Sequence, residues 1–121
     1  MNREIKFRAQ RTDTKEFVYG YYHEVEAEGV GYSYIFWQGN TIPVRADSVG
    51  QFTGLLDKNG KEIYEGDIYH MGDNTITYTV VWNDSGFIGK QNGSSSYAGL
   101  EYWMDRIEII GNVYENKNLI N

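Results

Sequence analysis

The sequence predicts a mainly β protein made of short strands, with at most one or two turns of helix. Apolar and polar side chains alternate in several short runs, which is the pattern of half-buried strands. Fourteen glycines and one proline among 121 residues indicate many tight turns between short segments. No long stretch has the periodicity of an amphipathic helix. We therefore expect one domain with a small barrel or a rolled sheet.

The first half of the chain predicts four strands joined by turns. The first strand is expected to be half-buried, because its apolar residues occupy every second position. Gly20 interrupts the second strand and indicates a bulge or a close approach of another backbone. Pro43 places the fourth segment at the edge of a sheet or outside it. These segments cover residues 3–11, 17–25, 32–37 and 41–46.

The second half predicts further strands and one short helical segment. A glycine-flanked run, residues 49–55, comes first, and strands are expected over residues 66–71, 75–82, 87–90 and 107–115. Leu100, Trp103 and Met104 have helical spacing. The serine-rich residues 91–99 predict a mobile loop, and Asn116 is expected to cap a final short turn.

Composition excludes several classes of protein. The absence of cysteine excludes disulfides, zinc-thiolate sites and thiol catalysis. No apolar run approaches the roughly 18 residues that span a bilayer, and the polar N-terminus lacks the apolar core of a signal peptide. We expect a cytoplasmic protein without membrane contact. The net charge is −6, which argues against wrapping nucleic acid.

The segment "DKNGKEIYEGD", Asp57 to Asp67, has three interpretations. As a calcium loop it fails at three of five positions, and Lys61 stands where a ligand is needed. As a catalytic pair, Glu65 and Asp67 lack the contrasting environments that separate an acid from a base. As a corner of a β-structure, "DKNG" forms one turn, Gly66 permits a second and Asp67 caps it. We expect the corner, and no metal.

Other motifs also favour structural roles. "DSG" at residues 84–86 lacks the glycine that precedes the serine of trypsin-like proteases, and the chain is short for their double barrel. His23 and His70 have no local metal-binding spacing. The glycine and serine residues of 91–99 lack the end of a phosphate-binding loop. We therefore expect no enzyme activity, no catalytic residue and no cofactor.

One stretch resembles a known family. "GQFTGLLDKNGKEIYEGDI", Gly50 to Ile68, is similar to the signature of the YopX family, and "REIKFRA" and "IEIIGNVYEN" resemble its outer blocks. Gln10 and Lys117 depart from the tryptophan and proline usual there. The resemblance implies an SH3-like barrel over residues 50–121 after an N-terminal β lobe over residues 1–49, and a phage or prophage origin. It implies no activity. The signature residues with expected structural roles are Gly50, Gly54, Asp57, Gly60, Gly66 and Asp67.

The eleven tyrosines and three tryptophans form the remaining candidate site. Exposed tyrosines beside basic residues suit stacking with single-stranded nucleic acid, a protein interface or cross-strand pairing within the sheet. We expect a non-enzymatic interaction module that binds a host or phage protein or a second copy, with a nucleic-acid-binding accessory protein as the alternative. The candidate surface comprises Lys6, Arg8, Arg11, Arg45, Tyr19, Tyr21, Tyr32 and Tyr34.

Overall fold

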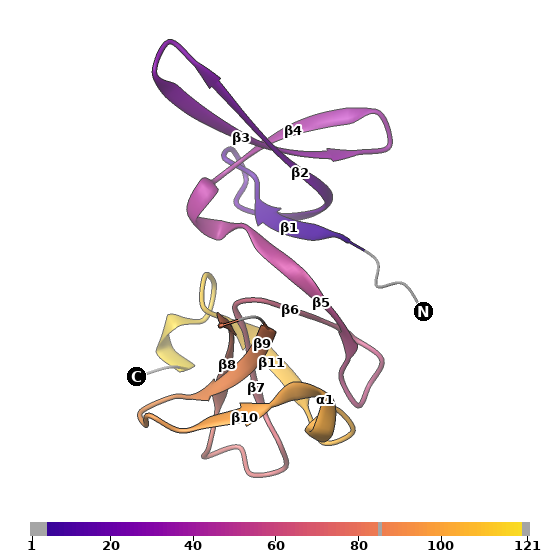
Figure 1. Ribbon diagram of the computed structural model, residues 1–121, viewed down its shortest axis with the longest axis vertical. Helices are drawn as coiled ribbons and strands as arrows, with labels where there is room; N and C mark the ends of the chain where they lie inside the picture. Colours follow the sequence, from indigo (N-terminus) through magenta and orange to yellow (C-terminus); the bar gives the residue numbers. More distant parts are fainter. Residues whose placement is uncertain (1–4, 85, 120–121) are drawn as a thin grey trace. The chain divides into compact units, whose positions relative to one another are not determined.

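The computed structural model describes residues 5–84 and 86–119, and the chain forms two compact units that meet in sequence between Phe52 and Thr53 (Figure 1). Short strands dominate both units, so the predicted mainly β class is confirmed. Unit one contains β1 (Phe7–Gln10), β2 (Phe17–Ala27), β3 (Val30–Trp37), β4 (Asn40–Val44), η1 (Ala46–Ser48) and the start of β5 (Gly50–Leu56). Unit two contains the rest of β5, β6 (Glu62–Tyr64), β7 (Asp67–His70), β8 (Tyr78–Asn83), β9 (Gly86–Gln91), β10 (Tyr97–Gly99), α1 (Leu100–Trp103), β11 (Glu108–Asn112) and η2 (Lys117–Leu119).

Unit one is an antiparallel sheet in which the strands lie in the order β4-β3-β2-β1-β5. Two-residue turns join β2 to β3 and β3 to β4. Glu28 and Gly29 have φ of 52° and 78°, and Gln38 and Gly39 have φ of 51° and 81°, as a type I′ hairpin turn requires. Pro43 lies on β4 at the edge of the sheet, so the prediction for this segment is confirmed.

One face of this sheet carries the core of unit one. Ala9, Ile35 and Val44 are buried there, and further apolar side chains pack around them. Gly20 lies where the backbones come close, because a Cβ added to it would stand 2.5 Å from the Phe36 carbonyl oxygen. The close approach predicted at Gly20 is therefore confirmed.

The prediction of a half-buried first strand is wrong. Arg8 and Gln10 alternate with the apolar residues of β1, yet they are only 5% and 4% exposed. The Gln10 backbone N–H donates to Ser48 Oγ at 2.8 Å, so η1 covers this end of the strand. Side chains on both faces of β1 are thus shielded from water, which alternation alone does not reveal.

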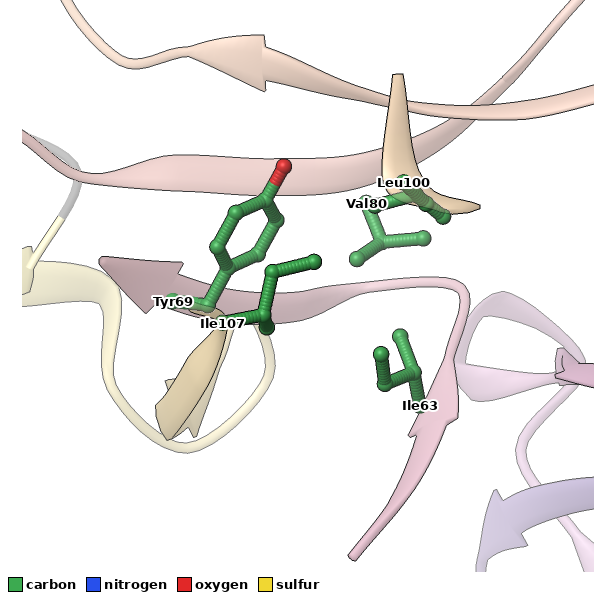
Figure 2. Close-up of a cluster of buried hydrophobic side chains, with 5 residues drawn as sticks. All are labelled: Ile63, Tyr69, Val80, Leu100 and Ile107. Atoms are coloured by element: carbon green, nitrogen blue, oxygen red, sulfur yellow. The ribbon is translucent and has the colours of Figure 1, made fainter. Parts of the chain in front are cut away.

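Unit two contains an open antiparallel sheet with the order β10-β9-β8-β7-β11, while β6 pairs with β5. Ile63, Tyr69, Val80, Leu100 and Ile107 are buried together in its core (Figure 2). Within residues 53–84 and 86–119 the strands do not close into a barrel. The SH3-like arrangement stays a prediction.

The serine-rich segment is more ordered than the sequence predicts. Tyr97 pairs with Lys90, so β10 completes a hairpin with β9. The Gln91 N–H donates to the Ser96 carbonyl at 2.9 Å, and Lys90 Nζ donates to the Ser94 carbonyl at 3.1 Å. The expectation of a mobile loop over all of residues 91–99 is wrong, because Tyr97–Gly99 form β10 and these two bonds shorten the connection to a tight turn.

Two shorter expectations have different outcomes. Leu100 is buried in α1, which confirms the predicted helical turn. Asn116 does not cap η2 with its side chain: its Oδ1 accepts from the Asn112 N–H at 3.1 Å. The Asn116 carbonyl instead accepts from the Leu119 N–H at 2.9 Å.

Candidate interaction surface

The tyrosines singled out in the sequence lie on the face of the unit-one sheet opposite its core. Cross-strand pairing places Tyr21 beside Phe36 and Val25 beside Tyr32. Because side chains alternate between the two faces of a strand, every second residue of β2 and β3 shares this face. We call it the aromatic face after its larger apolar members, Phe17, Tyr19, Tyr21, Val25, Tyr32, Tyr34 and Phe36. His23, Ala27 and Val30 lie on the same face.

Much of the aromatic face is open to solvent. The exposed fractions are 44% for Tyr19, 59% for Tyr21, 46% for Tyr32 and 45% for Phe36. Single exposed apolar residues are ordinary on protein surfaces, whereas a contiguous group of large ones marks an interaction site. Tyr21 and Phe36 lie opposite each other on the two strands, but cross-strand pairing does not require so much of each ring to remain exposed.

The basic residues of the candidate surface already have contacts within unit one. Lys6 Nζ lies 5.3 Å from the centre of the Phe52 ring. Arg8 is buried, and its guanidinium carbon lies 4.7 Å from the centre of the Phe17 ring. Both arrangements suit cation–π attraction. Arg8 is therefore shielded from a ligand, whereas Lys6 is half-buried and also contributes to packing.

The other two arginines form ion pairs. Arg11 Nε lies 2.9 Å from Asp13 Oδ1, and Arg45 Nη2 lies 3.1 Å from Asp47 Oδ2. The side-chain hydrogen bond from Arg11 lowers the pKa of Asp13 to about 2, and the same bond raises the pKa of Arg11. Each arginine is thus accompanied by a carboxylate, and the pairs add no net positive charge to this surface.

The signature segment forms a hydrogen-bonded corner around Asp57. Asp57 is 6% exposed. Its Oδ1 accepts from the backbone N–H groups of Asn59 and Lys61, both at 2.9 Å. Its Oδ2 accepts from the Ile109 N–H at 3.1 Å. The carboxylate therefore holds the turn after β5 against β11.

Asp67 and the signature glycines complete this corner. Asp67 is 1% exposed, and its Oδ2 accepts from the Tyr64 N–H at 2.7 Å. Gly54, Gly60 and Gly66 have φ of 89°, 82° and 95°, a region that favours glycine. Gly50 lies opposite Arg8 in the β1–β5 pair. These contacts support the β-corner interpretation.

The candidate metal ligands of the sequence lie within residues 5–84 and 86–119. That part of the chain holds no group of three His, Asp or Glu side chains able to bind a metal ion. His23 is exposed on β2, and His70 Nδ1 accepts from the Gly72 N–H at 3.1 Å. Ser85, at the centre of "DSG", lies outside the described residues.

Sequence reasoning missed two parts of the surface. Phe36 completes the aromatic face, and the alternation of residues 32–36 would have placed it beside the tyrosines. A pocket of about 240 Å³ lies along β3 and β4, and no local pattern indicates it because its walls come from separate segments. The pocket is lined by Thr12, Gly31, Tyr32, Ser33, Tyr34, Pro43, Val44 and Ala46.

These features define a mainly β protein of two compact units, one of which carries an exposed aromatic face. The chain belongs to the YopX protein family, whose model matches residues 6–121. It is also similar in fold to the protein EF1440 from Enterococcus faecalis, known from a crystal structure. That likeness has a TM-score of 0.61 and 22% identity, and covers 99% of this chain and 100% of the other.

Two negative findings accompany these matches. A search of curated proteins finds no match. Within residues 5–84 and 86–119, no helix has the length and apolar character needed to cross a membrane.

Proposed function

We propose that this protein is a non-enzymatic interaction module, and that its aromatic face binds a host or phage protein. The observation that carries the proposal is the group of exposed aromatic side chains on β2 and β3, opposite a face that already supplies the core. Tyrosine and tryptophan are enriched at protein interfaces, where they bury a large area at a small entropic cost. We include in this proposal the phage or prophage origin that the family resemblance implies and the cytoplasmic location expected from the composition.

Nucleic-acid binding is the second candidate, since bases stack on exposed aromatic rings. It needs cations to neutralise phosphate. The arrangement of Lys6, Arg8, Arg11 and Arg45 described above gives it little support, because each cation lies against a ring or a carboxylate. Nucleic-acid binding therefore serves as a competing outcome of the test.

A finer proposal concerns the fold of unit two. We propose that its strands are an opened relative of an SH3-like barrel. Two observations support this: the antiparallel order β10-β9-β8-β7-β11, and the packing of Ile63 from β6 into the same core. Short antiparallel strands around one apolar core suit a small barrel. β10 and β11 are the two outer strands of this sheet. An experimental structure in which other strands bridge them would support the barrel, and one in which they remain far apart would refute it.

The functional test is affinity capture from a bacterial lysate with three forms of the tagged protein. They are the wild type, the double variant Tyr21→Ala and Phe36→Ala, and the control Tyr102→Ala, which removes an aromatic ring 80% exposed in unit two. Each is captured with and without nuclease. We expect a protein that survives nuclease treatment, remains with the control and is lost with the double variant.

Two results would contradict the proposal. If the wild type and the double variant recover the same proteins, the aromatic face is not the interface. If the recovered material is nucleic acid and proteins disappear with nuclease, the second candidate replaces the first. Weakening of that binding by salt and by Lys6→Glu would then measure its electrostatic part.

A further inference from the structure

The tip of the β2–β3 hairpin projects beyond the other strands of unit one (Figure 1). β1 pairs with β2 only as far as Gly20, and β4 pairs with β3 only as far as Ser33. Among the described residues, residues 22–27 therefore pair only with β3, and residues 30–32 pair only with β2. We call this two-stranded ribbon the arm. An isolated two-stranded ribbon is marginally stable, and its unpaired edges can accept another strand.

The hairpin register shows which backbone groups face the open edge of β3. Residues flanking a two-residue turn exchange hydrogen bonds, and the pattern recurs at every second residue. Ala27 with Val30, and Val25 with Tyr32, are therefore the hydrogen-bonded pairs of the arm. Gly31 lies between them and directs its N–H and C=O away from β2. The arm thus offers one backbone donor and one acceptor at an edge.

The pocket of about 240 Å³ lies beside this edge. Gly31, Tyr32 and Ser33 line it from β3, and Ala46 lines it from the chain that leaves β4. A Cβ added at Gly31 would meet no atom within 4 Å, so the sheet face is uncrowded at Gly31. A strand placed along β3 here would have both a backbone partner and a cavity for a side chain.

The two faces of the arm have different chemistry. Val25, Val30 and Tyr32 are exposed on one face, and the alternating positions on the other face include Glu24 and Glu26, both exposed. Glu26 lies directly opposite Gly31 in the β2–β3 pair. A residue of an added strand that faced Gly31 would stand two strand spacings, roughly 10 Å, from Glu26. Since Gly31 has no side chain, a lysine or arginine could reach across toward that carboxylate.

We propose that the arm binds an extended segment of a partner protein as an additional strand on the Gly31 edge of β3. The segment alternates basic and apolar side chains: a basic residue opposite Gly31 faces Glu26, and its apolar neighbours pack beside Tyr32 and into the pocket. This is strand addition, in which backbone bonds supply affinity and alternate side chains supply specificity. The inference rests on the proposed function and names the chemistry of the partner.

The test uses a fluorescein-labelled peptide of alternating valine and lysine, with a peptide of alternating valine and glutamate as the reversed-charge control. Anisotropy titration measures the affinity of each. Gly31→Pro removes the outward N–H while leaving the β2–β3 hydrogen bonds in place, since proline is tolerated where an edge N–H faces outward. We expect the lysine peptide to bind wild type, and Gly31→Pro to weaken it about tenfold or more.

Matched variants separate the backbone contact from charge and folding. Glu26→Gln should weaken the lysine peptide and reduce its sensitivity to salt. Glu26→Pro removes the same carboxylate but blocks only the opposite edge, on β2. Its affinity for the lysine peptide should therefore equal that of Glu26→Gln. Amide hydrogen exchange on the wild-type protein needs no variant: added lysine peptide should slow exchange at Gly31.

The proposal is overturned if the lysine peptide binds no better than the glutamate peptide, or if Gly31 exchange is unchanged by saturating peptide. Self-association of the wild type that Gly31→Pro abolishes would assign the edge to a second copy instead. Affinity capture could recover a partner that is lost with the Tyr21→Ala and Phe36→Ala double variant but retained with Gly31→Pro. That result would support the proposed function and refute this inference. Peptide binding at Gly31 without any partner for the aromatic face would refute the proposed function alone.

Discussion

Replacement of Asp57 by alanine should destabilise unit two through the loss of three hydrogen bonds at once. The carboxylate accepts from the N–H groups of Asn59, Lys61 and Ile109 at 2.9 to 3.1 Å and is itself 6% exposed. A hydrogen bond to a charged acceptor contributes roughly 1.5–3 kcal/mol. Asn59 and Lys61 lie in an exposed turn, so water can replace the carboxylate at their N–H groups. We therefore expect a total loss of about 2–4 kcal/mol, much of it from the Ile109 bond.

Urea denaturation followed by tryptophan fluorescence measures this loss, because Trp103, one of the three tryptophans, packs against the unit-two core. The free energy of unfolding of Asp57→Asn should lie between those of Asp57→Ala and the wild type. The amide oxygen can still accept from the turn, while the NH₂ group faces the Ile109 N–H. Asp73→Ala is the matched control. Asp73 accepts from the Thr75 N–H at 2.9 Å in an exposed turn and should matter much less. Equal losses for Asp57→Ala and Asp73→Ala would refute the corner as an anchor between distant segments.

Three further predictions concern packing in unit two. Gly66→Val should lower the midpoint of urea denaturation strongly, since Gly66 has φ of 95° and an added Cβ would stand 3.0 Å from the Tyr114 ring; an unchanged midpoint would refute the corner. Gly89→Ala should destabilise too, because its Cβ would overlap the buried Tyr69 hydroxyl, and wild-type stability would show that this contact is loose. That hydroxyl has no hydrogen-bond partner among the described residues, so Tyr69→Phe should match or exceed wild type at pH 7. Burial raises the pKa of Tyr69 above its ordinary value of 10.0. The folded state therefore retains the proton that the unfolded state releases, wild-type stability falls above about pH 10, and Tyr69→Phe should reduce that fall in denaturation curves measured across alkaline pH.

Local signals in the sequence predicted most of the turns and several strands. Glycine at Gly66 and the "DKNG" turn determine backbone conformation over a few residues, so the corner could be predicted before any contact was known. Pro43 likewise indicated an edge strand because it lacks an N–H. Alternation grouped the tyrosines of β2 and β3, and the same rule would have included Phe36.

Features that depend on distant segments could not be predicted. Nothing near Arg8 in the sequence indicates that Phe17 and the covering segments bury its side chain. Asp57 was expected to hold its own turn, but its bond to Ile109 joins residues 52 positions apart. The open edge at Gly31 exists because β4 leaves the sheet after Val44, a consequence of topology that alternation does not encode.

The most direct measurement is hydroxyl-radical footprinting of the purified protein with and without the partner recovered by affinity capture. We predict protection of Tyr21, Tyr32 and Phe36 on binding, with no change at Tyr102, whose ring is 80% exposed in unit two. Protection confined to unit two, with the aromatic face as reactive as in the free protein, would contradict the claim that this face is the binding surface.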